Sequence, residues 1–326
     1  MRRTTLTIVR AFSFARADGN RIEEARAVNS ISRRAIPLVV PVLLLVAACS
    51  GSPGNTSGDA SARPPTQTTS AIPTPAESAT PDPDVIEGSF DVGGRSLHLE
   101  CRGSGDGPTI LYLHGYGGLG AHGSHLFDGY ADTHRVCVYD RANMGLSDPS
   151  DGTQAGADIA GDLTALMAAA EVPPPYLLVA QSHGGVIAEL YAGAQPDDVA
   201  GIVFIDASLH SDADLDRYFA SIGEMDLEAF QAEYNSEVEL TLWTIHDEAR
   251  AAIEHIPDIP MTYLMAVRAG EPPEPQETRS IWDAGLAELF ARSSNATLVE
   301  VDGPHDLPPP TVHEAINDML ELLSMQ

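Results

Sequence analysis

The sequence predicts an α/β protein with a mostly parallel sheet and helices on both faces. From Val85 onward, short apolar runs with strand character alternate with helical patterns. One run, residues 176–180, breaks at Ser182 among small residues and continues as a helical pattern, as at a strand-to-helix turn. The region from Val85 to the C-terminus holds about 240 residues, which is enough for one large core.

Residues 1–48 are predicted to be an N-terminal extension that ends in a lipoprotein signal peptide. Arg33 and Arg34 precede an apolar run of about 14 residues, whereas a membrane-spanning helix needs about 20. The run ends in Val-Ala-Ala before Cys49, which resembles the lipobox of bacterial lipoproteins, in which that cysteine is lipidated and becomes the mature N-terminus. We therefore expect an exported lipoprotein, held on the outer side of the cell membrane through Cys49. An ordinary signal peptide with an incidental cysteine and an uncleaved membrane anchor are the alternatives.

Residues 49–84 are predicted to be a disordered tether. This stretch consists largely of Ser, Thr, Pro, Gly and Ala, so it cannot bury enough apolar surface to offset the entropy of ordering. The folded domain then spans residues 85–326. The whole chain has a formal net charge of −29 from 18 basic and 47 acidic residues. A surface this acidic repels phosphate backbones, so we expect no nucleic-acid partner.

Eight strands are expected in the folded domain. Gly93-Gly94 joins the first two as a hairpin, with glycine where positive φ is needed. Helical patterns such as 155–170 and 281–292 separate later strands, so the sheet from the third strand on should be parallel. Residues 208–258 contain acidic amphipathic patterns without a strand and are expected to form a small helical cap over the carboxyl edge of the sheet. The expected strands are 86–92, 96–101, 109–113, 135–139, 176–180, 201–205, 261–267 and 297–301.

Ser182 is the candidate nucleophile. The small residues Ala180, Gly184 and Gly185 around it fit a sharp elbow in which the serine adopts positive φ. Such an elbow raises the hydroxyl above the carboxyl edge of the sheet. It also places the N–H of His183 at a helix N-terminus, where it can stabilise an oxyanion. The pattern differs from G-x-S-x-G only in Ala180, which replaces the first glycine.

A glycine-rich turn, residues 113–118, directly follows the third expected strand. Its backbone N–H groups should face the space above Ser182, and the N–H of Tyr116 is the candidate second oxyanion donor. A phosphate-binding loop is the rival interpretation, but the turn lacks the Lys-Ser/Thr ending of a P-loop.

Residues 140–148, Asp-Arg-Ala-Asn-Met-Gly-Leu-Ser-Asp, are similar to the D-R-x-G-x-G-x-S-D signature of the α/β-hydrolase superfamily, with Asn143 in place of one glycine. With His114-Gly115, the elbow at Ser182 and a late Gly303-Pro304-His305, the region from Val85 to the C-terminus resembles this superfamily. The resemblance implies an α/β-hydrolase fold with an eight-stranded sheet in the order 1-2-4-3-5-6-7-8. It also implies a triad of Ser, acid and His in that chain order.

His305, just past the last strand, is the expected base, because a serine hydroxyl needs a neighbouring imidazole to take its proton. Asp206, at the carboxyl end of the sixth strand, is the expected acid, although it could instead cap the first helix of the cap. The commoner position of the acid, after the seventh strand, offers only Glu271 and Glu274, which stay as alternatives. His183, His122 and His125 could line the pocket without being catalytic, whereas four others are expected to be mostly solvated: His98, His246, His255 and His313.

The predicted function is cleavage of a carboxylic ester by an acyl-enzyme mechanism, without a metal or organic cofactor. The same triad could cleave a peptide, an amide or a C–C bond, and the same fold could bind a ligand without turnover. The strand order that the resemblance implies places the second and fourth strands side by side. If Cys49 is lipidated, Cys101 and Cys137 are therefore expected to form a disulfide outside the cytoplasm, with two buried free thiols as the alternative.

Overall fold

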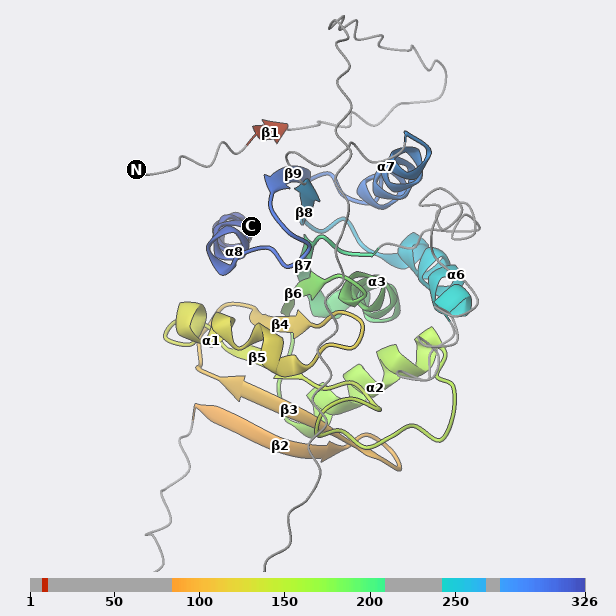
Figure 1. Ribbon diagram of the computed structural model, residues 1–326. Helices are drawn as coiled ribbons and strands as arrows, with labels where there is room; N and C mark the ends of the chain where they lie inside the picture. The colour runs from red at the N-terminus through yellow and green to blue at the C-terminus, as the bar shows by residue number, and fades with distance from the viewer. Residues whose placement is uncertain (1–7, 11–83, 209–241, 268–275, 326) are drawn as a thin grey trace, which may run out of the picture. The chain divides into compact units, whose positions relative to one another are not determined.

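The computed structural model describes residues 8–10, 84–208, 242–267 and 276–325 (Figure 1). The predicted signal peptide around Cys49, nearly all of the predicted tether, and the alternative acids Glu271 and Glu274 lie outside these residues, as does the part 209–241 of the predicted cap. Within the described ranges, no helix is both long and apolar enough to cross a membrane.

A nine-stranded sheet lies at the centre of the fold, in the order β1-β9-β8-β7-β6-β4-β5-β3-β2. Strands β4 to β9 pair in parallel, whereas β2 and β3 form an antiparallel hairpin that joins the sheet through β5. The strands are β1 (Ile8–Arg10), β2 (Val85–Asp91), β3 (Ser96–Arg102), β4 (Thr109–Leu113), β5 (Val136–Tyr139), β6 (Tyr176–Gln181), β7 (Val199–Ile205), β8 (Met261–Val267) and β9 (Ala296–Asp302).

The order of the eight strands from β2 to β9 confirms the predicted order 1-2-4-3-5-6-7-8. Strand β1 is an addition that the sequence did not predict, and it pairs antiparallel with β9. Strand β1 lies within residues 1–48, which the predicted cleavage before Cys49 would remove, and β9 would then be an edge strand with a row of unpaired N–H and C=O groups.

The hairpin between β2 and β3 turns at two glycines, as predicted. Gly93 and Gly94 have φ values of +102° and +106°. Both N–H groups donate to Asp91 Oδ1, at 2.8 and 3.2 Å. These two bonds lower the pKa of the Asp91 carboxyl below its ordinary value, since they favour the ionised form.

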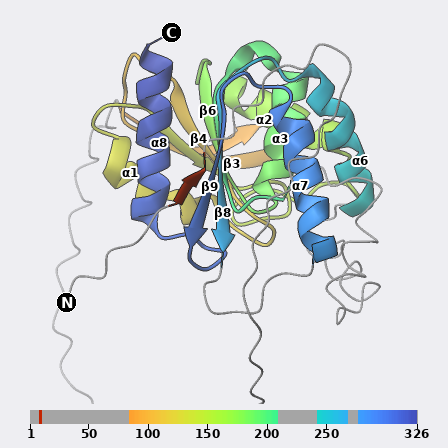
Figure 2. The same cartoon turned by 90° about the horizontal axis from the view of Figure 1, so that it is seen from above.

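Helices cover both faces of the sheet, which confirms the predicted layers (Figures 1 and 2). Helices α1 and α8 lie on one face, and α2, α3, α6 and α7 lie on the other. In β6, Leu177 and Val179 pack with the first layer, whereas Leu178 and Ala180 pack with the second. All four are fully buried, so this central strand is apolar on both sides. The helices are α1 (His125–Tyr130), α2 (Gly156–Ala169), α3 (Gly184–Ala194), α6 (Leu242–Ala252), α7 (Gln276–Phe290), α8 (Pro309–Ser324), and the short 3₁₀ helices η1 (Gly120–Gly123), η2 (Pro196–Asp198) and η4 (Ile253–His255).

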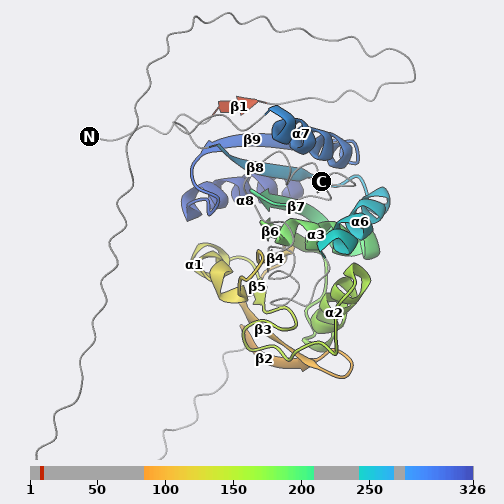
Figure 3. The same cartoon turned by 45° about the vertical axis from the view of Figure 1, so that its right-hand side comes forward.

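The described part of the predicted cap belongs to a layer of the sheet. From residue 242 the chain forms α6, which packs along α3 (Figure 3). Ile245, Ala249 and Ile253 repeat every four residues and are at most 2 % exposed, so the apolar stripe of the helix faces this layer. The structure thus places residues 242–255 in the helical layer beside α3. An apolar stripe predicts that a helix packs, but it does not identify the surface on which it packs.

Cys101 and Cys137 form a disulfide. They are direct register partners on the antiparallel strands β3 and β5, with 4.1 Å between their Cα atoms. The bond ties the antiparallel hairpin to the parallel part of the sheet. It also closes a loop that contains β4 and the glycine-rich turn.

Candidate active site

Ser182 lies at a tight turn between β6 and α3, with a φ of +51°. Its N–H donates to the Ile205 carbonyl at 3.1 Å, and its own carbonyl accepts the N–H of Ser208 at 2.8 Å. A Cβ at Gly184 would lie 2.0 Å from the carbonyl oxygen of Leu113, so only glycine fits there. The turn therefore has the geometry that the sequence predicts for a nucleophile elbow.

Asp206 and His305 are hydrogen-bonded to each other. Asp206 follows β7 with a φ of +41°. Its Oδ1 accepts the N–H of Ala266 at 2.9 Å, and its Oδ2 lies 2.7 Å from His305 Nδ1. Because an ionised carboxylate only accepts, His305 Nδ1 donates its proton, and in the neutral imidazole the lone pair is then on Nε2.

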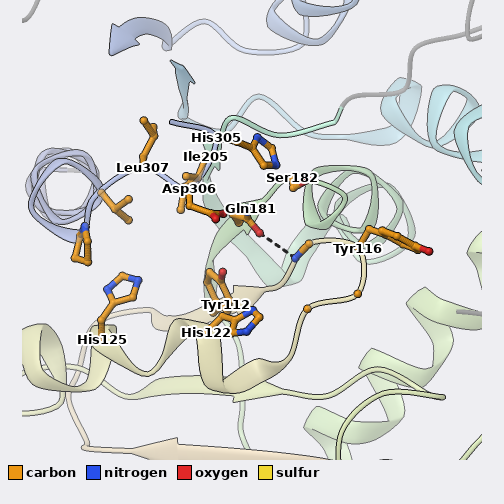
Figure 4. A pocket seen from close by; sticks show the side chains of 15 residues that line it. Tyr112, Tyr116, His122, His125, Gln181, Ser182, Ile205, His305, Asp306 and Leu307 are labelled. Atoms are coloured by element: carbon orange, nitrogen blue, oxygen red, sulfur yellow. Dashed lines mark hydrogen bonds between the residues drawn. The ribbon is translucent and has the colours of Figure 1, made fainter. Parts of the chain in front are cut away.

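Ser182 and His305 line one cavity of about 430 Å³ (Figure 4). Figure 4 shows both at one end of the cavity and His125 at the other. Tyr116 lines the same cavity. The structure thus brings together the predicted nucleophile, the predicted base with its acid, and the residue of the predicted oxyanion donor.

The peptide that links Gly115 to Tyr116 is held by its carbonyl group. The Gly115 oxygen accepts bonds from Arg141 Nη2 at 2.8 Å and from His114 Nδ1 at 2.9 Å. Arg141 Nη1 also donates to the His114 carbonyl at 2.6 Å. In a trans peptide the C=O and N–H groups point in opposite directions, so anchoring this oxygen fixes the direction of the Tyr116 N–H.

The segment after β5 supports the glycine-rich turn. Asp140 Oδ1 accepts the N–H of Gly120 at 2.8 Å, and its Oδ2 accepts the N–H of Leu146 at 3.0 Å. Ser147 Oγ donates to the Asp140 carbonyl at 2.6 Å. Asn143, which replaces a glycine of the signature, has a φ of +68°. Asparagine tolerates this left-handed conformation better than most residues, so the replacement preserves the loop.

Two buried histidines beside the elbow are neutral near pH 7. His114 is 0 % and His183 is 3 % exposed. Burial lowers the pKa of both well below the ordinary value of 6.5, and the charge of Arg141 lowers them further. Arg141 is itself buried but keeps its charge, because a guanidinium does not lose its proton in proteins. A fixed positive charge therefore lies behind the turn, where it favours an oxyanion in front of it.

The other histidines range from buried to exposed: His255 is exposed, and His98 and His313 are half-buried. His122 and His125 line the cavity, as the sequence suggested, whereas His183 is buried and does not line it. His246 was expected to be solvated but is 4 % exposed, because it lies on α6, which packs against α3. Among the described residues, no cluster of three or more His, Cys, Asp or Glu side chains could hold a metal ion.

Gln181 is a site residue that the sequence did not point to. It ends β6 directly before Ser182 and lines the cavity. Its side chain accepts the N–H of Gly115 at 3.2 Å and donates to Asp306 Oδ1 at 3.1 Å. The only sequence signal was its place next to the nucleophile, which does not reveal either partner.

Comparison with known proteins agrees with the observed fold. A family model described as "alpha/beta hydrolase fold" matches residues 108–247. The uncharacterized protein YqjL of Bacillus subtilis is 26% identical over 243 residues, which cover 72% of this chain and 92% of YqjL. The structure of the esterase RhEst1 from Rhodococcus sp. ECU1013 is similar with a TM-score of 0.50 and 19% identity, covering 74% of this chain and 99% of the esterase. That of the enol-lactonase from Burkholderia xenovorans LB400 is similar with a TM-score of 0.51 and 17% identity, covering 72% of this chain and 100% of the lactonase. Together with the strand order, these findings establish that the chain has the α/β-hydrolase fold.

Proposed function

We propose that this protein is a serine hydrolase that cleaves a carboxylic ester through an acyl-enzyme intermediate. The observation that carries the proposal is the 2.7 Å bond between His305 Nδ1 and Asp206 Oδ2, at a cavity that His305 shares with Ser182. Such a pair orients the imidazole so that Nε2 can take the serine proton. The fold and the matching family model support a hydrolase independently of these residues.

In the first half of the reaction, Ser182 Oγ attacks the ester carbonyl carbon while His305 Nε2 accepts the hydroxyl proton. The negative charge on the carbonyl oxygen is stabilised by the N–H groups of Tyr116 and His183. His305 then gives its proton to the departing alcohol. In the second half, His305 takes a proton from water as the water oxygen attacks the acyl carbon. The bond from this carbon to Ser182 Oγ then breaks, His305 returns the proton to Oγ, and the acid product leaves.

We propose an ester, rather than a peptide, as the substrate class. The cavity of about 430 Å³ accommodates a small molecule. Two proteins of the same fold are described as an esterase and an enol-lactonase, and both names refer to cleavage of an ester linkage. Amide, peptide and C–C bond cleavage on the same triad, and ligand binding without turnover, are the competing functions.

A fluorophosphonate probe tests the proposal directly. We expect the probe to label the folded protein at Ser182 and the Ser182→Ala variant to remain unlabelled. A panel of nitrophenyl esters of increasing acyl length should then show turnover, with the preferred length reporting the size of the cavity. Absence of labelling in folded protein would favour the ligand-binding alternative.

The acid of the triad needs its own comparison, because Glu271 and Glu274 were the alternatives. Asp206→Asn should lower kcat by about 10³-fold or more, as expected for loss of the group that orients the base. Glu271→Gln and Glu274→Gln serve as matched variants and should stay close to wild type. A loss of that size in either glutamate variant, with little loss in Asp206→Asn, would assign the acid to the glutamate.

The same proposal includes export and attachment to the outer face of the cell membrane through a lipid on Cys49. It rests on the sequence around Cys49, and it is supported by the disulfide between Cys101 and Cys137, since disulfides persist outside the cytoplasm. Wild-type protein should carry an acyl label and sediment with membranes, whereas Cys49→Ala should lose the label. A Cys49→Ala protein that keeps its acyl label would overturn this part of the proposal.

A further inference from the structure

Gln181 connects two loops that carry different parts of the candidate active site. Its Oε1 accepts the N–H of Gly115, in the glycine-rich turn, at 3.2 Å. Its Nε2 donates to Oδ1 of Asp306, the residue after His305, at 3.1 Å. Figure 4 shows this side chain between Asp306 and the turn, beside Ser182.

The turn is shaped to admit this side chain. A Cβ at Gly115 would lie 2.6 Å from Gln181 Oε1 and 3.0 Å from Ser182 Cβ, so the glycine lets the turn approach both residues. The carbonyl of Gly115 is held on the other side by Arg141 Nη2 at 2.8 Å. Gly115 is therefore fixed at its N–H by Gln181 and at its oxygen by Arg141, and the next N–H along the chain is the proposed oxyanion donor of Tyr116.

The nitrogen of the Gln181 amide contacts the loop that carries the proposed base, His305. His305 is anchored through Nδ1 to Asp206, and its side chain is 45 % exposed, so the position of Nε2 also depends on the loop that carries this residue. The bond from Gln181 Nε2 to Asp306 ties the next residue of this loop to the strand that carries Ser182.

We propose that Gln181 is a positioning residue for the hydrolysis, an inference that rests on the function proposed above. The side-chain amide of Gln181 fixes the distance between the glycine-rich turn and the loop that carries His305, on either side of Ser182. Gln181 does not touch the reacting atoms in this role. A glutamine suits it because the turn offers a donor and Asp306 offers an acceptor, and one amide group supplies both an acceptor oxygen and a donor N–H.

A charge exchange between residues 181 and 306 tests this role. Gln181→Glu keeps an acceptor for Gly115 but sets a carboxylate against Asp306, so kcat should fall by about tenfold or more while KM changes by less than about threefold. Asp306→Asn alone keeps an acceptor for the Gln181 amide and should cost less than about threefold. In the double variant, the carboxylate introduced at position 181 can accept from both Gly115 and the new amide at position 306, so kcat should recover to within about threefold of Asp306→Asn.

A second amide and carboxylate pair in the same protein provides the matched control. Gln154 Nε2 donates to Asp162 Oδ2 at 2.9 Å, and neither residue lines the cavity. Gln154→Glu should therefore destabilise the protein without changing kcat. Gln181→Met removes both bonds without adding charge. It should lower kcat in the same way as Gln181→Glu, but Asp306→Asn should not rescue it.

The outcomes separate the inference from the proposed function. If wild-type Ser182 is labelled and active, and Gln181→Glu and Gln181→Met keep wild-type kcat, the positioning role is refuted and the hydrolase stands. A folded double variant that stays as slow as Gln181→Glu refutes it as well. If wild-type Ser182 neither reacts with the probe nor turns over esters, the proposed function fails and this inference fails with it.

Discussion

Loss of the disulfide between Cys101 and Cys137 should lower the stability of the domain by an amount that depends on the number of residues between the two cysteines. The two cysteines are separated by 36 residues. Closing a loop of this size removes about 13 cal/mol/K of entropy from the unfolded chain, or about 3.8 kcal/mol at 25 °C. For a domain of about 240 residues, that loss corresponds to a fall in Tm of about 8 to 15 °C.

Urea unfolding of the purified protein, with and without a thiol reductant, measures this difference. The reduced wild type is the better comparison, because both sulfur atoms are buried and reduction leaves their volume in place. A Cys101→Ala, Cys137→Ala double variant then serves as a control that does not respond to reductant. Equal free energies of unfolding for oxidised and reduced wild type would refute the reasoning. So would two titratable thiols in the unfolded, unreduced mature protein.

Three further predictions follow from the contacts around the glycine-rich turn. Arg141→Lys cannot span the His114 and Gly115 carbonyls with a planar fork, so kcat should fall by up to about 10²-fold with KM nearly unchanged in steady-state kinetics. Gly184→Ala would place its Cβ 2.0 Å from a carbonyl oxygen and should cost about 3 kcal/mol or more in urea unfolding, whereas the matched Gly161→Ala, with open space around it, should be neutral or stabilising. Because the pKa of His114 is depressed in the folded state, the unfolded chain binds protons first as the pH falls below about 6.5, so stability is lost on acidification. His114→Asn should reduce the slope of unfolding free energy against pH by about 1.4 kcal/mol per unit near pH 5.5, and an unchanged slope would exclude this source.

The strands of the sheet could be predicted because they are apolar runs bounded by residues that favour turns. The predicted ranges 109–113 and 261–267 coincide with β4 and β8, and the others differ by one or two residues at their ends. The helix α6 shows the limit of this reasoning. Its apolar stripe is visible in the sequence, but the same stripe could face the sheet or a cap, and only the folded chain shows that it packs along α3.

The site residues that could be predicted are those that directly follow a parallel strand, because the end of the strand fixes their position. Ser182 and Asp206 each follow a parallel strand, and the resemblance to a known signature gave their chain order relative to His305. Gln181 was not predictable, because its two partners, Gly115 and Asp306, are brought together only when two loops fold over the same strand end. The motif containing Arg141 was recognised, yet its contact with the Gly115 carbonyl depends on the same tertiary approach.

The three members of the proposed triad extend from strands that lie at different distances from the edge of the sheet. Ser182 and Asp206 extend from β6 and β7, neighbours in the middle of the sheet, whereas His305 extends from β9, much closer to its margin. Transient openings begin in exposed loops and reach central strands only at complete unfolding. As the temperature rises, we therefore expect the His305 side chain to leave its position before Ser182 and Asp206 leave theirs. Catalysis by this arrangement would cease while the sheet is still intact, and it would return on cooling.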